Sequence, residues 1–383
     1  MIGYGILGNG NILYTTGGAR GFGKIYRLSF PKYIMAALLN FFYIWFKSFI
    51  IPDRDCFPIS INTGYFIKSV IFAKISHFSG FDQLLKNQIL VFNGCYHGSV
   101  DETMVRLVDG KPVNRPGLAG EFRDLTEATK VVEFNDIPAL EKALAGRDVA
   151  CVITEPVLTN CCMVLPAPGF HDALRRLTRK AGTLLLIDET HTISTGPGGY
   201  TRRFGLEPDL FVLGKPIAGG VPASVWGMSA ELAKRYRAYV STKEPGYSGM
   251  GTTLSANPLQ FAAMRATLEE VMTEANYAHM ERLAQHLASG LAAAITAHGL
   301  PWHVARVGAR VEFICAKGPL KNGGEAETAH APGLEAAIHV ALVNRGVLIA
   351  PFHNMMLVSP ATTKRQVDRL VAAFGEVAEK LTA

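Results

Sequence analysis

The sequence has few of the residues from which metal centres and disulfide-bonded scaffolds are built. Its 383 residues include six cysteines, and their spacing matches no paired metal-binding motif. The first long apolar run lies far from Met1 and has no small-residue cleavage site, so no secretory signal peptide is recognisable. We therefore expect reduced thiols, no metal site and a cytoplasmic location.

The first 90 residues lack glutamate altogether. They hold nine Lys or Arg and three Asp, whereas residues 91–383 hold 29 basic and 29 acidic side chains. The same 90 residues contain 11 of the 21 phenylalanines but only four alanines. Two regimes of composition therefore meet near Gln88, and the net charge of +6 belongs to the first of them. The balanced second regime gives no reason to expect nucleic acid as a partner.

One long apolar run lies in this N-terminal segment, at residues 33–51. Its length and hydropathy suit a transmembrane helix, and the basic residues before it favour a cytoplasmic N-terminus. A buried pair of helices packed on an enzyme domain explains it equally well. A fused or mispredicted segment explains it better, because the composition changes abruptly. Membrane contact through residues 33–51 is therefore not the favoured interpretation.

Two short apolar runs end in residues that carry chemistry. Residues 183–187 precede Asp188, and residues 211–214 precede Lys215. If both runs are buried parallel strands, their carboxyl ends face one crevice of an open α/β sheet, where such folds bind ligands. A lysine amine forms a Schiff base with pyridoxal 5′-phosphate, and a carboxylate keeps the pyridine nitrogen protonated. Taken alone, a helix cap and a solvated loop charge explain the pair better, because short motifs match easily by chance.

Six blocks in order along the chain reverse that preference. They are Gly94–Gly98 (GCYHG), Glu155–Asn160 (EPVLTN), Pro168–Phe170 (PGF), Asp188–Glu189 with Pro208–Leu210 and Leu213–Lys215, Thr253–Pro258 (TLSANP), and Arg345–Pro351 (RGVLIAP). With these blocks the chain resembles, from about residue 91 to 383, the class III pyridoxal-phosphate-dependent aminotransferases. That fold type I group includes ω-aminotransferases and glutamate-1-semialdehyde aminomutase.

The resemblance implies an α/β fold with a mostly parallel sheet and a smaller C-terminal α+β domain. We expect a cofactor-binding large domain at residues 91–275 and a small domain at 276–383, after the atypical segment 1–90. Alternating apolar runs agree with a parallel sheet covered on both faces. They predict strands at 88–92, 149–154, 184–188, 210–213 and 304–316, helices at 137–145, 170–180, 278–297 and 363–381, a helical pattern from 257 toward 274, and a loop at 317–327.

The resemblance also assigns roles to single residues. Lys215 and Asp188 form the catalytic pair, and Arg310 is a candidate clamp for a substrate carboxylate. Thr253 matches the threonine that reaches across a homodimer to the phosphate held by the neighbouring subunit. The remaining cofactor-binding residues are Tyr96, which stacks on the ring, His97, Gly98, Glu155 and Asn160. An ordinary turn, loop or edge-strand role explains Asn160, Thr253 and Arg310 comparably well.

The chain departs from the family pattern in two places. Thr190 stands where the family has a valine under the ring, and the adjacent His191 is more simply explained as a hydrogen-bonded polar residue than as a pH-sensitive one. The family's Ser-Gly-Thr-Glu-Ala-type turn, whose amides bind the cofactor phosphate, has no match at residues 67–71. We therefore expect weaker cofactor binding than in a complete family member.

The function expected from these features is pyridoxal-phosphate-dependent transfer of an amino group between an amine or amino acid and a keto acid or aldehyde. Two alternatives stay open. The GCYHG, EPVLTN and TLSANP blocks lean toward an aminomutase of the glutamate-1-semialdehyde type, which moves the amino group within one substrate. The missing phosphate turn allows an incomplete or membrane-tethered homologue without catalysis.

Overall fold

The computed structural model describes, with side chains, residues 86–98, 100–115, 124–245, 257–350 and 354–382, and it describes the backbone of strands at 2–7, 11–16, 25–29 and 57–62. The chain forms two compact units, Met1–Arg54 and Asp55–Ala383. In the first unit, strands β1 (Ile2–Leu7), β2 (Asn11–Thr16) and β3 (Ile25–Ser29) form an antiparallel sheet in that order.

A seven-stranded sheet forms the centre of the second unit. Its order is β4 (Phe57–Asn62), β12 (Ser224–Met228), β11 (Leu210–Leu213), β10 (Leu184–Asp188), β9 (Val149–Thr154), β5 (Gln88–Phe92), β8 (Thr129–Val132). The strands from β11 to β8 are parallel, and β12 is antiparallel to both of its neighbours. Every residue of β9 and β10 is buried. A parallel sheet covered on both faces requires such apolar runs.

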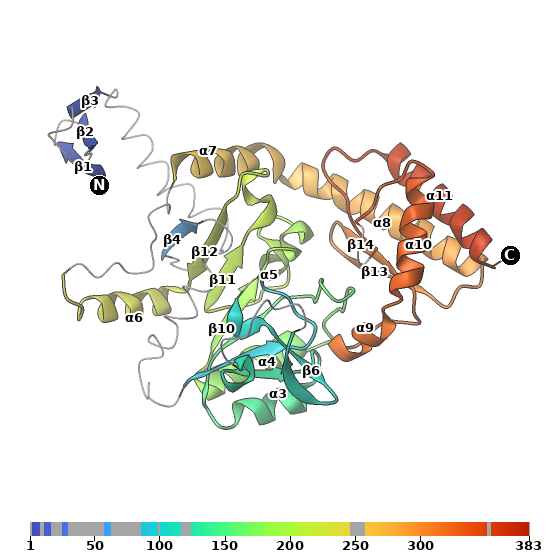
Figure 1. Ribbon diagram of the computed structural model, residues 1–383, viewed down its shortest axis with the longest axis horizontal. Helices are drawn as coiled ribbons and strands as arrows, with labels where there is room; N and C mark the ends of the chain where they lie inside the picture. The colour runs from blue at the N-terminus through green and yellow to red at the C-terminus, as the bar shows by residue number, and fades with distance from the viewer. Residues whose placement is uncertain are drawn as a thin grey trace. The chain divides into compact units, whose positions relative to one another are not determined.

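Helices α3 (Ile137–Leu144) and α4 (Phe170–Ala181) pack together beside this sheet (Figure 1). Asp136 caps α3 by accepting from the backbone N–H of Ala139 at 2.9 Å. Helix α4 buries an apolar stripe at helical spacing, Phe170, Ala173, Leu174, Leu177 and Ala181. It ends at Gly182 with φ +63°, a left-handed conformation that glycine adopts without steric cost.

The C-terminal part is built around a three-stranded antiparallel sheet, β13 (His303–Val307), β14 (Arg310–Ile314) and β15 (Met355–Leu357). The long helices α8 (Glu274–Ala297) and α11 (Lys364–Thr382) lie side by side against it (Figure 1). Helices α9 (Gly323–Ala329) and α10 (Pro332–Val343) connect the strands. A second core forms here, with Leu291, Phe313, Leu342 and Phe374 almost fully buried.

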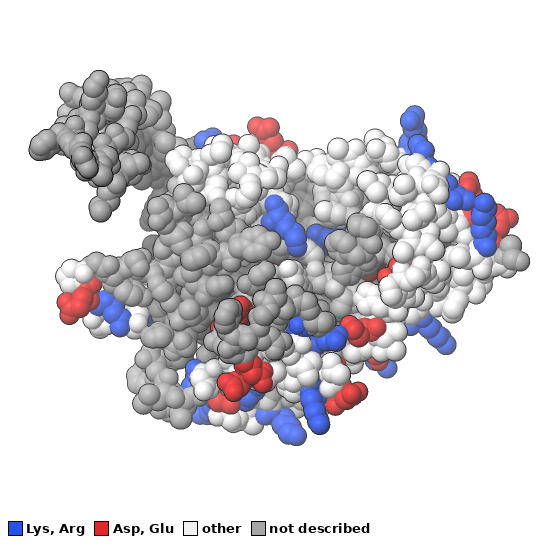
Figure 2. Space-filling view, in the orientation of Figure 1, with Lys and Arg blue, Asp and Glu red and all other residues white. Residues whose placement is uncertain are grey.

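Shorter elements complete the described part of the second unit. They are η1 (Asp101–Thr103), β6 (Val105–Val108), β7 (Lys111–Asn114), η2 (Leu125–Glu127), η3 (Thr192–Thr195), α5 (Gly199–Arg203), η4 (Lys215–Ala218), α6 (Ala230–Val240), α7 (Pro258–Ala266) and the π-helical turn η5 (Thr267–Val271). On the face shown in Figure 2, basic and acidic side chains of the described residues lie interspersed.

The α/β fold with a mostly parallel sheet and a separate small antiparallel sheet is confirmed. Two local expectations were wrong. The strand expected at 304–316 is a hairpin of β13 and β14, because Gly308 turns the chain at φ +53°. Helix α9 begins inside the loop expected at 317–327. The helical pattern expected from 257 toward 274 is confirmed, because the π-helical turn η5 continues α7 as far as Val271.

Several expectations concern residues that the structure does not describe. The apolar run at 33–51 and the segment at 67–71 lie outside the described residues, as does Thr253. Within the described part of the chain, no helix has both the length and the hydropathy needed to cross a membrane. Strand β4 pairs with β12, and the compact units divide between Arg54 and Asp55. The domain boundaries after residues 90 and 275 stay predictions.

Candidate functional site

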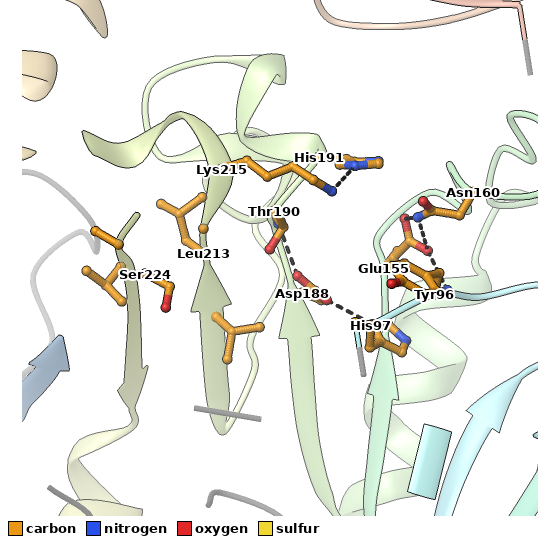
Figure 3. Close-up of a pocket in the computed structure, with 15 residues that line it drawn as sticks. Tyr96, His97, Glu155, Asn160, Asp188, Thr190, His191, Leu213, Lys215 and Ser224 are labelled. Atoms are coloured by element: carbon orange, nitrogen blue, oxygen red, sulfur yellow. Dashed lines mark hydrogen bonds and ion pairs between the residues drawn. The ribbon is translucent and has the colours of Figure 1, made fainter. Parts of the chain in front are cut away.

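Four neighbouring parallel strands deliver the site residues to one edge of the sheet. Tyr96 and His97 follow β5, Glu155 follows β9, Asp188 ends β10, and Lys215 lies two residues after β11. The carboxyl ends of parallel strands are where open α/β sheets bind ligands. A cavity of about 320 Å³ lies there, a size within the ordinary range for small-molecule sites. Its lining includes Tyr96, His97, Gly98, Glu155, Asn160, Asp188, Thr190, His191, Lys215 and Ser224 (Figure 3).

Lys215 is held in a strained backbone conformation at the start of η4. Its φ is +45°, in the left-handed region that residues with a β-carbon seldom occupy. Pro216 follows it and restricts the chain further. The side chain extends across the cavity, and its Nζ contacts Nε2 of His191 (Figure 3). Strain of this kind clusters at active sites, where the surrounding structure holds a side chain in place.

Asp188 and His97 form a buried pair in the lining of the cavity. Nδ1 of His97 lies 2.9 Å from Oδ2 of Asp188, and the two side chains are 0% and 3% exposed. Oδ1 of Asp188 accepts from the backbone N–H of Thr190 at 3.2 Å. Burial alone would lower the pKa of His97, but its interactions with the neighbouring Cys95 and with Asp188 outweigh burial and raise this pKa to about 9. At neutral pH the pair is therefore an imidazolium and a carboxylate.

We expect the stability of the cofactor-free protein to fall as the pH rises from about 6.5, the ordinary histidine value, to about 9. A folded-state pKa above the unfolded value stabilises the fold fully below the unfolded pKa, and this contribution is lost as the pH passes the folded pKa. The loss is on the order of 3 kcal/mol. Urea unfolding of the parent and of His97→Gln across this range measures it. The same slope in both proteins would contradict this assignment.

Glu155, at the carboxyl end of β9, accepts hydrogen bonds from three neighbouring groups. Its carboxylate accepts from the Thr159 hydroxyl at 2.5 Å, from the Asn160 amide at 3.2 and 3.3 Å, and from the backbone N–H of Tyr96 at 3.3 Å. These bonds hold the loops after β5 and β9 together. They leave Tyr96 40% exposed on the cavity, with a flat ring available for stacking.

His191 joins this group to Lys215. Its Nδ1 lies 2.5 Å from the Thr159 hydroxyl, and its backbone carbonyl accepts from Nε of Arg310 at 2.9 Å. Arg310 is 7% exposed and does not line the cavity. Burial lowers its pKa to about 10, against the opposing charge of Glu155. The role of Arg310 as a substrate clamp stays a prediction, and its observed contacts include the backbone carbonyl of His191 and Sδ of Met355 at 3.5 Å.

Seven of the residues selected from the sequence line one cavity, as described above. The sequence reasoning missed Thr159 and Ser224, and it treated His191 as an ordinary polar residue. Thr159 lies within the EPVLTN block, four residues after Glu155, so its block was a usable signal. Nothing local in the sequence marks Ser224, because it reaches the cavity from an antiparallel strand. The five cysteines that the structure describes, which are all except Cys56, are free thiols.

The donor set of this cavity fits pyridoxal 5′-phosphate. Its lining offers a lysine amine, a buried carboxylate and an exposed aromatic ring. The buried Nε2 atom of His97 has no hydrogen-bond partner among the described residues. One hydrogen-bonding position next to Asp188 is therefore unused by these residues. An amine for the aldehyde, an acid for the ring nitrogen and a stacking surface for the ring suit this cofactor. Thr253, which was expected to contact its phosphate, lies outside the described residues.

Comparison with known proteins agrees with this geometry. The chain is 38% identical over 293 residues to a glutamate-1-semialdehyde 2,1-aminomutase of Thermomicrobium roseum, covering 75% of this chain and 66% of the relative. It is 36% identical over 296 residues to the corresponding protein of Sorangium cellulosum, covering 76% and 66%. The chain thus spans about two thirds of the length of these curated relatives.

Solved structures extend the comparison. A glutamate-1-semialdehyde aminomutase from Pseudomonas aeruginosa PAO1 is 46% identical, with a TM-score of 0.80, covering 85% of this chain and 72% of that one. A variant of it, 44% identical, was solved in complex with PMP. An omega-transaminase from Sphaerobacter thermophilus, 22% identical with a TM-score of 0.70 over 99% and 91% of the chains, shows the fold alone. The aminotransferase class-III family model matches residues 71–377, and the chain therefore belongs to the class III aminotransferase family.

Proposed function

We propose that this chain transfers amino groups between an amine or amino acid and a keto acid or aldehyde, with pyridoxal 5′-phosphate as cofactor. The observation that carries the proposal is the meeting of Lys215 and Asp188 in one cavity at the carboxyl ends of β11 and β10. Membership of the class III family supports it. Pyridoxal phosphate, when bound, supplies an electron sink for the carbon next to the substrate nitrogen.

The side chains of the cavity have separate tasks in this proposal. Lys215 holds the cofactor covalently through Nζ, and the same amine carries a proton to and from the substrate carbon once the substrate has displaced it. Asp188 keeps a proton on the ring nitrogen, because a buried carboxylate favours a nearby positive charge. His97 fixes the orientation of Asp188 through the 2.9 Å contact. Tyr96 and Asn160 cover and orient the ring from the loops after β5 and β9.

Three further parts of the proposal rest on the sequence. The partners are small amine and keto-acid molecules. A homodimer follows from the match of Thr253, whose role across a subunit interface stays a prediction because Thr253 lies outside the described residues. A cytoplasmic location is consistent with the free thiols of the described cysteines, since oxidising compartments favour disulfides.

Intramolecular transfer is the second candidate function. The named relatives at 36–38% identity, and the structures at 44–46%, are glutamate-1-semialdehyde aminomutases, whereas the omega-transaminase structure at 22% supports the fold alone. In such a reaction one molecule both gives and receives the amino group. The same residues, Lys215 and Asp188, serve both reactions, so the cavity residues named above do not separate the two.

A one-substrate against two-substrate assay tests the proposal. With added pyridoxal phosphate, we expect ¹⁵N from a labelled amino acid to pass to an added keto acid and to require both molecules. An aminomutase instead isomerises glutamate-1-semialdehyde with no keto acid present. Absence of both reactions in a protein that retains its cofactor through gel filtration would refute the proposed function.

A further inference from the structure

A hydrogen-bonded chain of four side chains joins Lys215 to a buried carboxylate. Nζ of Lys215 contacts Nε2 of His191; Nδ1 of His191 lies 2.5 Å from the Thr159 hydroxyl, which donates to Oε2 of Glu155 at 2.5 Å. These four residues come from the loops after β11, β10 and β9. Figure 3 shows the contact between Lys215 and His191, and it shows Glu155. This series of hydrogen bonds therefore lies at the same strand ends as the cavity, but it does not include Asp188.

The direction of each hydrogen bond in this chain follows from counting protons. The Glu155 carboxylate can only accept, so Thr159 donates its single hydroxyl proton to the hydrogen bond with Glu155. Thr159 must then accept from His191, which places the ring proton on Nδ1. In a neutral imidazole the other nitrogen, Nε2, carries a lone pair. That lone pair faces Nζ of Lys215.

The hydrogen-bonded side chains next to Lys215 are also held rigidly. Thr159 is 0% exposed, Glu155 3% and His191 8%. The backbone carbonyl of His191 accepts from Nε of Arg310 and from the Ser194 hydroxyl, each at 2.9 Å. A histidine whose backbone and far nitrogen are both fixed presents its remaining nitrogen in one orientation. This is the arrangement by which a base is oriented toward a nucleophile in other enzymes.

We propose that His191 is the base that takes a proton from the Lys215 ammonium, and that Thr159 and Glu155 are positioning residues that fix its tautomer. The step is a proton transfer only: the Nζ–H bond breaks, the Nε2–H bond forms, and the electron pair stays on Nζ. The neutral amine is then the nucleophile needed for covalent attachment of the cofactor. This inference rests on the proposed function, because it concerns the same lysine.

Other charged groups surround His191 and bear on its protonation. Glu155 acts through Thr159 and favours the imidazolium, whereas the Arg310 guanidinium at the His191 carbonyl opposes it. The Asp188–His97 pair lines the same cavity from β10 and the loop after β5. Glu189, the next acid along the chain from Asp188, is fully buried, and its carboxylate accepts from Thr192, Tyr200 and Thr201.

The test measures how fast cofactor-free protein captures pyridoxal phosphate at Lys215. Adducts are trapped with borohydride at timed intervals and located by peptide mass spectrometry, from about pH 7 to about pH 10.5, the ordinary lysine pKa. In His191→Asn the side-chain amide keeps a hydrogen-bonding group near the position of Nδ1, but no atom takes the position of Nε2. We expect capture at least about 100-fold slower than in the parent near pH 7, the low end of what a general base contributes. The two rates should converge as the pH approaches the ordinary lysine pKa.

Thr159 gives a second pair of variants. Thr159→Val removes the hydroxyl and should show a smaller loss with the same convergence at high pH, whereas Thr159→Ser keeps the hydroxyl and should behave as the parent. His303→Asn is the matched control. Nδ1 of His303 donates to the Ala316 carbonyl at 2.8 Å, and His303 is not among the residues that line the cavity. Its capture rate should equal that of the parent at every pH.

The outcomes separate this inference from the proposed function. No trapped adduct on Lys215 in the parent would refute the proposed function itself. An adduct in the parent with an unchanged rate in His191→Asn would overturn the inference alone. A rate that falls by the same factor at every pH would also overturn it, because a merely structural role has no reason to vanish when solvent deprotonates the lysine.

Discussion

Lys215→Ala is expected to abolish the visible absorbance that pyridoxal phosphate gives when it is bound through a lysine. No other lysine lines the cavity as described, so no amine replaces Nζ there. The variant should also lose amino transfer by a factor of about 10³ or more, because removal of a positioned acid–base group costs about 10²–10⁴ and the covalent attachment is lost as well. Absorbance spectra and single-turnover rates of the loaded protein measure both effects.

Lys234→Ala is the matched control for this substitution. Lys234 lies exposed on α6, and it is not among the residues that line the cavity. Its loss should leave the spectrum and the rate as in the parent. A Lys215→Ala protein that kept the parent spectrum would show that another amine holds the cofactor. The assignment of Lys215 would then be wrong, although the family membership would stand.

Asp188→Asn is expected to have the second largest effect. The amide keeps the shape of the carboxylate but not its charge, so the ring nitrogen loses the group that holds its proton. Removing one preorganised electrostatic contact of this kind costs about 10²–10³ in kcat. The substitution also takes the charged partner away from the buried His97, which we expect to cost about 1–3 kcal/mol of stability.

Asp209→Asn makes the same chemical change at a structural position. The Asp209 carboxylate pairs with both terminal nitrogens of Arg175 at 2.8 and 2.9 Å and accepts from the Leu185 backbone N–H. This variant should lose stability but keep the parent kcat, measured by steady-state assay and by urea unfolding. A full kcat in Asp188→Asn with cofactor bound would contradict the role given to Asp188.

Local patterns in the sequence were sufficient to predict much of the fold. The residues of β10, Leu184–Asp188, form an apolar run that only a fully covered strand can use, and the stripe on α4 has the period of a helix packed on one face. The hairpin of β13 and β14 was missed because its turn at Gly308 depends on close packing against a segment that is distant in sequence. A β-carbon on Gly308 would lie 2.4 Å from the Cα of Thr195, an atom 113 residues away in sequence.

The sequence by itself determined which residues were predicted for the site, because six blocks in order along the chain are typical of one family. Asp188 and Lys215 each follow an apolar run, and these runs predicted two parallel strands whose carboxyl ends face one crevice. Only the tertiary structure decided which side chains contact Lys215. His191 lies 24 residues from Lys215 and 32 from Thr159 in sequence, yet it contacts both. Hydrogen-bond partners of a buried histidine are set by which loops the sheet brings together, and no period or spacing in one segment carries that information.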